Sequence, residues 1–210
     1  MNTFSAKSLE RLHQLLAKPG RKILGIVGPP GAGKSTLAQN LVRFCNQELA
    51  IQAQYLPMDG YHLAQKELER LGRADRKGAP DTFDAAGYCH LLKRLRQQET
   101  DEVVYAPDFQ REIEEPIAGA IAIFASTELI ITEGNYLLME QDGWAGASSA
   151  LDEVWYLDVD PKIRLYRLLK RHIQFGRNKE DAMAWIENTD EPNAIKILAT
   201  RERADFCTEE

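Results

Sequence analysis

Short apolar runs alternate with helically spaced apolar positions along most of the chain. Runs of strand length, largely apolar, occur at 23–27, 51–57, 129–133 and 154–159. Runs of this kind are typical of parallel strands that are buried on both faces. Apolar residues recur at helical spacing over 35–48, 84–98 and 161–175. This alternation predicts an α/β fold with a mainly parallel, doubly wound sheet.

Shorter elements complete this frame. Ser5 is expected to cap a helix that runs to about Ala17, where Pro19-Gly20 ends it. From 103 to 124 the pattern changes to short strand-like pieces broken by prolines, which predicts a β-hairpin inserted over the substrate. Further short helices are expected at 63–71, 180–187 and 192–197, with a polar loop at 72–80. We expect one domain over 1–210, with the hairpin at about 103–124 and a helical lid at about 167–181.

Composition and charge limit the functional classes. A net charge of −6 over 210 residues argues against a protein that coats nucleic acid, which would be basic. The three cysteines, Cys45, Cys89 and Cys207, are odd in number and far apart, which favours a reducing compartment and gives no zinc pattern. No apolar run approaches the ~18 residues that span a bilayer. Because Met1-Asn2-Thr3-Phe4 also lacks an export pattern, we expect a cytoplasmic protein with no membrane partner.

A complete phosphate-binding loop follows the first apolar run. Residues 28–35 match G-x-x-x-x-G-K-[ST], because Gly28, Gly33, Lys34 and Ser35 occupy its fixed positions. Glycines let backbone N–H groups point at phosphate oxygens, and the helix that begins here adds the positive end of its dipole. Lys34 would reach the β- and γ-phosphates, and the Ser35 hydroxyl would bind Mg²⁺. The residues expected to bind nucleotide are Gly28, Pro29, Gly31, Ala32, Gly33, Lys34, Ser35 and Thr36.

Carboxylates end two other strands, at the edge where ligands bind in open α/β sheets. Asp59 could accept the proton of a substrate hydroxyl, bind Mg²⁺ through water, or cap the helix that follows. Glu133 ends the run 129–133 and is expected to face the metal. The metal side is therefore predicted to consist of Ser35, Asp59 and Glu133, with Asp59 also the candidate base.

The basic helix at 161–175 carries the candidate lid. A charge-rich helix is often only a solvated face, but phosphoryl transfer needs mobile cations to stabilise the transferred charge. Arg171 is our first choice for this role, with Arg167 and Arg177 as rivals. Arg171 thus joins Asp59 and Lys34 in the expected catalytic set, and Arg167 is also expected to contact the nucleotide.

Two segments imitate guanine-nucleotide motifs. Residues 178–181 fit N-K-x-D, and residues 84–87 fit D-x-x-G. Neither follows an apolar strand, and both lie at or within helical stretches. A GTPase switch is therefore not expected.

Taken together, these residues resemble a family of small-molecule kinases that includes uridine kinase, pantothenate kinase and phosphoribulokinase. The resemblance covers about residues 23–197 and rests on the order and spacing of the phosphate loop, 59–62, 77–84, 107–109, 131–134 and 167–172. Residues 133–136 and 190–194 are most similar to a bacterial subgroup described as nucleoside/nucleotide kinase-like proteins or as kinases of fructose transport systems. One departure is Gly78-Ala79-Pro80, where uridine kinases usually show Asp-His-Pro.

The resemblance implies a P-loop kinase fold, three layers α/β/α with a short hairpin over the acceptor. It implies an ATP- and Mg²⁺-dependent kinase that phosphorylates a hydroxyl of a sugar, a nucleoside or a pantothenate-like metabolite. In this family the position of Asp59 supplies the base and the position of Glu133 supports the metal. Related kinases are often dimers, which leaves a homodimer open. Acceptor contacts are expected from Tyr61, His62, Lys77, Asp108, Phe109, Arg111 and Asn135, although Tyr61 and Phe109 could instead simply pack.

Two other classes of protein remain as alternatives. One is a regulatory P-loop ATPase that hydrolyses nucleotide and has no working acceptor site. The other is a non-catalytic protein that binds nucleotide only for stability. Asp59 and Glu133 argue against both, because a binding-only module has no use for a base.

Overall fold

A five-stranded parallel sheet forms the centre of the computed structural model, which describes residues 4–209. In spatial order its strands are β2 (Ala53–Pro57), β5 (Leu129–Gly134), β1 (Lys22–Val27), β6 (Glu153–Asp158) and β7 (Phe206–Glu209). All residues of β1 and β5 are buried, as their apolar runs predict for most positions, and the burial extends to Lys22, Thr132 and Glu133. The predicted α/β fold with a mainly parallel sheet is confirmed. Residues 1–3, part of the segment examined for an export pattern, lie outside the described residues.

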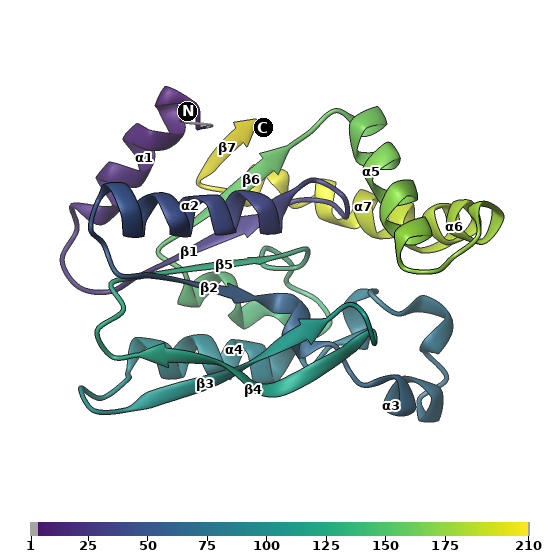
Figure 1. Cartoon of the computed structure of the whole chain (residues 1–210), viewed down its shortest axis with the longest axis horizontal. Coiled ribbons are helices and arrows are strands. Elements are labelled where there is room, and N and C mark those ends of the chain that lie inside the picture. The colour runs from purple at the N-terminus through teal and green to yellow at the C-terminus, as the bar shows by residue number, and fades with distance from the viewer. Residues whose placement is uncertain (1–3, 210) are drawn as a thin grey trace.

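Helices cover both faces of the sheet (Figure 1). Alternate residues of β1 point to opposite faces, so Leu24 belongs to one apolar cluster and Ile23 to the other. The Leu24 side is covered by α1 (Ala6–Leu16) and α2 (Lys34–Glu48). The Ile23 side is covered by α4 (Ala85–Arg96) and by residues 136–150. The core is therefore divided by the sheet, and the site lies at the sheet's carboxyl edge.

The predicted hairpin is present as β3 (Val103–Gln110) and β4 (Glu115–Phe124), which pair antiparallel. The prolines do not break the strands: the register shifts once, between Ala106 and Asp108, where Pro107 lies, and Pro116 pairs with Phe109. The Gln54 side chain of β2 holds the hairpin's far end by donating to Ala122 O at 2.8 Å and accepting from Phe124 N at 3.2 Å. The turn at 111–114 thereby projects toward the carboxyl edge of the sheet (Figure 1).

The C-terminal helices extend beyond the carboxyl ends of the strands (Figure 1). They are α5 (Pro161–Gln174), α6 (Lys179–Trp185) and α7 (Glu191–Leu198), and the small helix α3 (Gln65–Arg70) lies at the same end. The separate helices expected at 180–187 and 192–197 are in fact joined by a π-helical turn over 186–190. The wider turn accommodates Pro192, which has no N–H to donate and would clash with the preceding turn of a regular helix.

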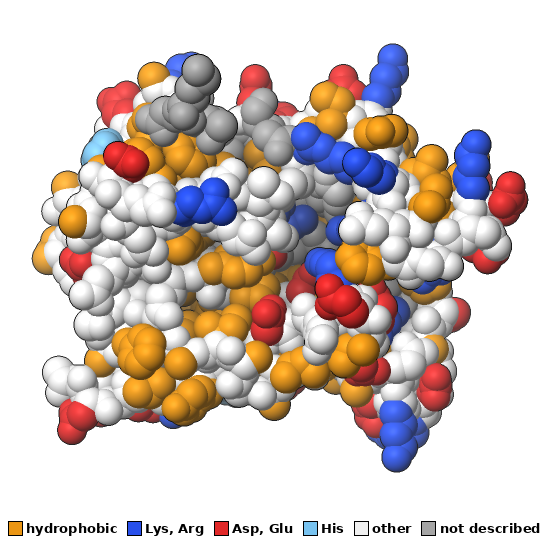
Figure 2. All heavy atoms as spheres, viewed as in Figure 1, with side chains coloured by type: hydrophobic (Ala, Val, Ile, Leu, Met, Phe, Trp, Pro, Cys, Tyr) orange, Lys and Arg blue, Asp and Glu red, His pale blue; other side chains and the backbone are white. Residues whose placement is uncertain are grey.

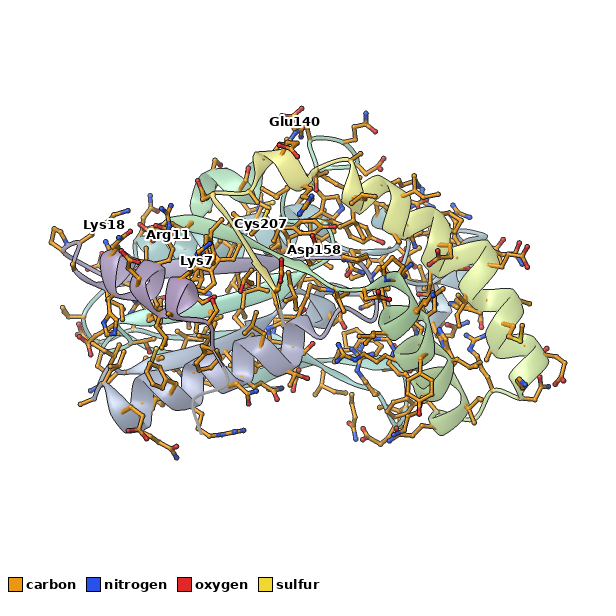
Figure 3. The ribbon with its side chains drawn as sticks, turned by 90° about the horizontal axis from the view of Figure 1, so that it is seen from above. Lys7, Arg11, Lys18, Glu140, Asp158 and Cys207 are labelled. Atoms are coloured by element: carbon orange, nitrogen blue, oxygen red, sulfur yellow. The ribbon has the colours of Figure 1, made fainter. Side chains whose placement is uncertain are left out.

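The N-terminal helix α1 packs along the sheet near β7 (Figure 3). Ser5 caps it as predicted, because the Ser5 hydroxyl accepts a hydrogen bond from Ser8 N at 3.1 Å. The Ser8 hydroxyl in turn lies 2.8 Å from that of Thr208 on β7. Arg11 adds an ion pair to Glu153 of β6 at 2.9 Å. These contacts explain the position of β7, which sequence analysis did not predict because residues 206–209 form no apolar run.

Within residues 4–209, no helix is both long and apolar enough to cross a membrane. Cys45, Cys89 and Cys207 are all free thiols.

Candidate active site

The phosphate loop lies between β1 and α2 and depends on glycine at two points. Gly31 and Gly33 have φ values of +80° and +100°, a region that residues with a Cβ rarely adopt. A Cβ on Gly31 would also lie 2.8 Å from Arg164 O, so the loop is packed closely against α5. Lys34 is the first residue of α2, whose free N–H groups therefore begin at the loop. The local structure is that of an anion site.

Lys34 is buried beneath the loop. In this structure its Nζ donates to Asn135 Oδ1 at 2.7 Å and to Pro29 O at 3.2 Å. Burial lowers the pKa of Lys34 to about 8, although the carboxylates of Glu133 and Asp59 act in the opposite direction. The ammonium thus faces neutral oxygens at hydrogen-bonding distance, and a bound phosphate would replace them with full negative charge.

Glu133 forms the metal side of the site. Its Oε1 accepts hydrogen bonds from the Ser35 hydroxyl at 2.9 Å and from the Tyr55 hydroxyl at 2.7 Å. Burial raises the pKa of Glu133, and the nearby Asp59 carboxylate raises it further. Residues 4–209 contain no cluster of three or more His, Cys, Asp or Glu placed to hold a metal ion. One hydroxyl beside one carboxylate fits Mg²⁺, which usually binds through a few protein oxygens together with phosphate and water.

Asp59 lies in the turn after β2 and faces the same cavity. Its Oδ2 accepts from Arg111 Nη2 at 2.7 Å, so the hairpin turn delivers a cation directly to this carboxylate. Burial alone would raise the pKa of Asp59, but His62, Arg111 and Lys34 outweigh it and keep the pKa below its ordinary value. The Asp59 side chain caps no helix, so the capping alternative loses its support.

Gly60 determines how closely the hairpin approaches Asp59. A Cβ at Gly60 would lie 2.3 Å from Pro107 O, a backbone atom of β3 that cannot easily move aside. Only a residue without a Cβ therefore lets β3 pack against the turn that carries Asp59. The hydrogen bond between Arg111 and Asp59 depends on this approach.

His62 lies between two aromatic rings on the hairpin side. The centroid of its ring is 4.0 Å from that of Phe83 and 4.6 Å from that of Phe109. Its Nδ1 lies 2.7 Å from the carbonyl oxygen of Asp59, and a carbonyl can only accept, so Nδ1 carries the proton. Burial lowers the pKa of His62 despite the opposing effect of Asp59. A neutral imidazole then keeps Nε2 as a hydrogen-bond acceptor.

The lid arginines take different places. Arg171 lines the cavity, and burial together with Arg111 lowers its pKa. Arg177 also lines the cavity, with its guanidinium stacked 3.8 Å from the centroid of the Trp185 ring. Arg167 instead lies against the phosphate loop, where its Nη1 donates to Ala32 O at 3.3 Å. Beside Arg171, His172 lies 2.7 Å from Asp190 in the π-helical turn.

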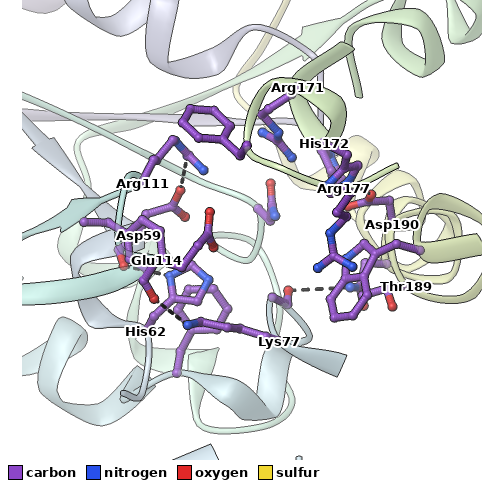
Figure 4. Close-up of a pocket in the computed structure, with 18 of the residues that line it drawn as sticks. Asp59, His62, Lys77, Arg111, Glu114, Arg171, His172, Arg177, Thr189 and Asp190 are labelled. Carbon is purple, nitrogen blue, oxygen red and sulfur yellow. Dashed lines mark hydrogen bonds and ion pairs between the residues drawn. The ribbon is translucent and has the colours of Figure 1, made fainter. Parts of the chain in front are cut away.

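Most of these side chains line one hollow of about 450 Å³. Figure 2 shows it as a depression between α2 and the α5–α6 segment, with basic and acidic side chains around it. Figure 4 shows the hairpin residues facing the helical residues across this space. The predicted site residues that line it are Lys34, Ser35, Asp59, His62, Lys77, Phe109, Arg111, Glu133, Asn135 and Arg171.

Two predicted acceptor residues lie elsewhere. Tyr61 packs against the core, with its ring edge-on to that of Tyr88 and the two ring centroids 5.4 Å apart. Packing was one of the two roles expected for Tyr61. Asp108 is exposed on β3, where its Oδ1 accepts from Phe109 N at 2.8 Å. The two imitation motifs are helix caps: Asn178 Oδ1 accepts from Asp181 N, and Asp84 Oδ1 accepts from Gly87 N, both at 2.8 Å.

Other residues at the site were not singled out by sequence analysis. Tyr55 reaches Glu133 because β2 pairs with β5, a neighbour relation that the sequence does not state. Others line the cavity from the hairpin turn and the C-terminal helices, among them Glu114, Trp185, Thr189, Asp190 and Asn193. The similarity of residues 190–194 to a kinase subgroup was the one signal that could have found the last two.

The parallel sheet, the phosphate loop and the hairpin across the carboxyl edge define the fold of a P-loop kinase. The family described as "Phosphoribulokinase / Uridine kinase family" matches residues 23–208. The chain belongs to this family.

Named relatives agree with this assignment. A Schizosaccharomyces pombe protein named "Putative uridine kinase" is 33% identical over 192 residues, covering 89% of this chain and 81% of that protein. A crystal structure described as a "putative fructose transport system kinase" from Silicibacter sp. TM1040 is 36% identical and covers 99% of both chains with a TM-score of 0.87. YFH7 of Saccharomyces cerevisiae, described as a "putative P-loop containing kinase with a circular permutation", has a TM-score of 0.77 at 19% identity, covering 97% and 96% of the chains. The chain is therefore an ATP-dependent P-loop kinase.

Proposed function

We propose that this kinase transfers the γ-phosphate of ATP, with Mg²⁺, to a hydroxyl of a small polar metabolite. The observation that carries the proposal is that the Asp59 carboxylate faces the same cavity as Lys34, Ser35 and Glu133. A carboxylate held beside a phosphate loop is suited to accept the proton of an incoming hydroxyl. A nucleotide-binding module has no use for a base, and an ATPase, whose acceptor is water, has no use for a cavity that admits a second substrate.

Each residue has a defined part in the transfer. Asp59 accepts the hydroxyl proton as the acceptor oxygen bonds to the γ-phosphorus and the bond to the bridging oxygen of ADP breaks. Lys34 holds the β- and γ-phosphates, and Arg171 stabilises the transferred charge from the lid. Mg²⁺ supplies neutralisation of phosphate charge when it is bound, and Ser35 and Glu133 are the residues that would hold it.

The low pKa of Asp59 keeps its carboxylate ionised but also makes it a weak base. Arg111 keeps the carboxylate ionised, so it is ready to accept a hydrogen bond from the acceptor hydroxyl. A base this weak takes the proton late, when the oxygen has begun to bond to phosphorus and has become acidic. This fits phosphoryl transfer, in which positioning and charge stabilisation contribute most of the rate.

The cytoplasmic location and the homodimer stay predictions.

The test is ADP release with Mg²⁺ and ATP across a panel of sugars, sugar phosphates, nucleosides and pantothenate. Lys34→Ala and Asp59→Asn would be assayed in parallel, with exposed Arg43→Ala of α2 as the matched surface control. We expect one acceptor class to raise turnover in the wild type and in Arg43→Ala but in neither active-site variant. Slow hydrolysis that no acceptor stimulates, lost in Lys34→Ala and kept in Asp59→Asn, would instead support the regulatory ATPase.

A further inference from the structure

We propose that the acceptor carries an anionic group, a carboxylate or a phosphate, in addition to the hydroxyl that receives the phosphoryl group. This inference rests on the proposed kinase function and names the substrate class of the same site. The inference comes from the charged side chains that line the cavity on the side of the hairpin turn and the C-terminal helices, away from the phosphate loop.

Two of the three carboxylates in that part already have partners. Asp59 is bound by Arg111 at 2.7 Å, and Asp190 lies 2.7 Å from His172. Glu114, exposed at the hairpin turn, is the third. Neither Asp190 nor Glu114 forms an ion pair with the two other cations of this part, Lys77 and Arg177, among the described residues.

Lys77 and Arg177 are counted apart from Arg171, which is assigned to the transferred phosphate. Lys77 Nζ donates to neutral acceptors, the Glu114 carbonyl oxygen and, at 3.5 Å, Gln65 Oε1. Arg177 stacks on Trp185. Among residues 4–209, neither Lys77 nor Arg177 forms an ion pair with a carboxylate. Both side chains are half-buried, so each retains charge that water only partly solvates.

The two cations occupy facing walls of the cavity. Figure 4 shows the Lys77 side chain reaching toward the hairpin side, near His62, and Arg177 on the helical side, beside His172 and Asp190. Arg171 lies on a different part of the wall, above Arg177 in that view. A molecule that places its hydroxyl at Asp59 would therefore place its other end between Lys77 and Arg177. Guanidinium and ammonium groups bind carboxylate and phosphate oxygens with charge-assisted hydrogen bonds.

A wholly neutral sugar or nucleoside would leave both charges unused. Neutral His62 offers Nε2 to a hydroxyl, so the hairpin wall already serves the uncharged part of an acceptor. Lys77 and Arg177 add positive charge, which a neutral molecule cannot use. Together with His62, these two cations would select a hydroxylated anion over its uncharged counterpart.

The experiment compares matched pairs of compounds by calorimetry in the presence of Mg²⁺ and a non-hydrolysable ATP analogue, which occupies the phosphate loop. The pairs are glycerol and D-glycerate, ribose and ribose 5-phosphate, and fructose and fructose 6-phosphate. The glycerate pair probes a carboxylate, and the other pairs probe a phosphate. Wild type is compared with Arg177→Gln, Lys77→Gln and the control Arg43→Gln, and each pair is also assayed with ATP for phosphorylated product.

We expect the anionic member of at least one pair to bind about tenfold or more tightly than its neutral partner. Arg177→Gln and Lys77→Gln should reduce that preference toward unity without weakening neutral binding, and Arg43→Gln should keep it. Equal or tighter binding of the neutral members, or no binding by any pair, would overturn the inference. Anionic binding without any phosphorylated product would keep it and overturn the kinase proposal instead.

Discussion

The pKa of Lys34 depends on two opposing effects: burial in the loop, and the phosphate that the loop would bind. Burial lowers its pKa to about 8 in the ligand-free protein. A phosphate at the same point favours the charged form and raises that pKa. Nucleotide binding should therefore take up a proton at a pH above 8, where free Lys34 is mostly neutral, and should not do so well below 8.

This proton uptake is measurable by calorimetry with metal-free ADP in buffers of different ionisation enthalpy. We expect on the order of half a proton or more per nucleotide at about pH 8.5, and close to none at about pH 6.5. Lys34→Met should abolish the uptake while the fold is retained. Equal uptake by Lys34→Met would assign the proton to another group.

Tyr55 acts on the metal side through Glu133. Its hydroxyl donates to Glu133 Oε1 at 2.7 Å, which favours the carboxylate that burial disfavours. Tyr55→Phe removes this bond and should raise the pKa of Glu133 further. Because only ionised Glu133 would assist Mg²⁺, the Mg²⁺ concentration for half-maximal activity should rise about tenfold, and more as the pH falls.

A magnesium titration of ATP-dependent activity at two pH values would measure the effect of Tyr55→Phe. Tyr105→Phe is the matched control, because Tyr105 is 62% exposed on the hairpin and does not line the cavity. Superimposable Mg²⁺ curves for wild type and Tyr55→Phe would show that Tyr55 only packs.

At the scale of elements, the turn after β2 and the hairpin function as a unit because Gly60 permits their contact. Gly60→Ala would force β3 away from Asp59 and break the geometry of the Arg111 hydrogen bond. We expect a loss of about 1–3 kcal/mol in the free energy of unfolding, and a fall in turnover that exceeds the change in ATP affinity. Urea unfolding and steady-state kinetics would measure the two effects.

Gly146→Ala is the control for that variant. A Cβ there would meet Cys89 at 3.5 Å, an ordinary contact, so stability should change by less than about 0.5 kcal/mol. If Gly60→Ala behaved like Gly146→Ala, the hairpin would not depend on the close approach at Gly60.

Elements that are specified locally could be predicted from the sequence. The buried strands β1 and β5, the loop ahead of Lys34 and the Ser5 cap all follow from short-range patterns. The strand β7 could not be predicted, because residues 206–209 have no strand pattern of their own and are held in place by contacts with β6 and α1. The wide turn ahead of Pro192 likewise resolves a conflict between proline and a continuous helix.

The site shows the same division. The residues of the phosphate loop and the strand ends could be placed because their positions follow from the motif and the sheet. Glu114 and Thr189 could not, since they meet only when the hairpin turn and the π-helical turn are brought to one cavity. Tyr61 and Asp108 belong to elements that border the cavity, but their side chains do not line it.

At the scale of the whole molecule, the phosphate loop connects the sheet, α2 and α5, so nucleotide should stabilise the entire fold. At a ligand concentration 100 times Kd, binding contributes about 2.7 kcal/mol. For a chain of this size that corresponds to a rise in Tm of roughly 5–10 °C. Thermal unfolding with and without ATP and Mg²⁺ would measure it.

Lys34→Ala should lose most of this stabilisation, and Arg43→Ala should keep it. A wild-type Tm that nucleotide leaves unchanged would contradict the role of the loop. Retained stabilisation in Lys34→Ala would show that Lys34 contributes little to nucleotide affinity.

In the proposed mechanism, Asp59 directs the phosphoryl group to an acceptor hydroxyl. The most direct measurement is the amount of phosphorylated acceptor and of free phosphate formed from ATP by wild type, Asp59→Asn and the exposed control Asp101→Asn. We predict that Asp59→Asn lowers acceptor phosphorylation by about 10²–10⁴-fold while ATP affinity changes little. Acceptor phosphorylation that continues at the wild-type rate in Asp59→Asn would contradict the account.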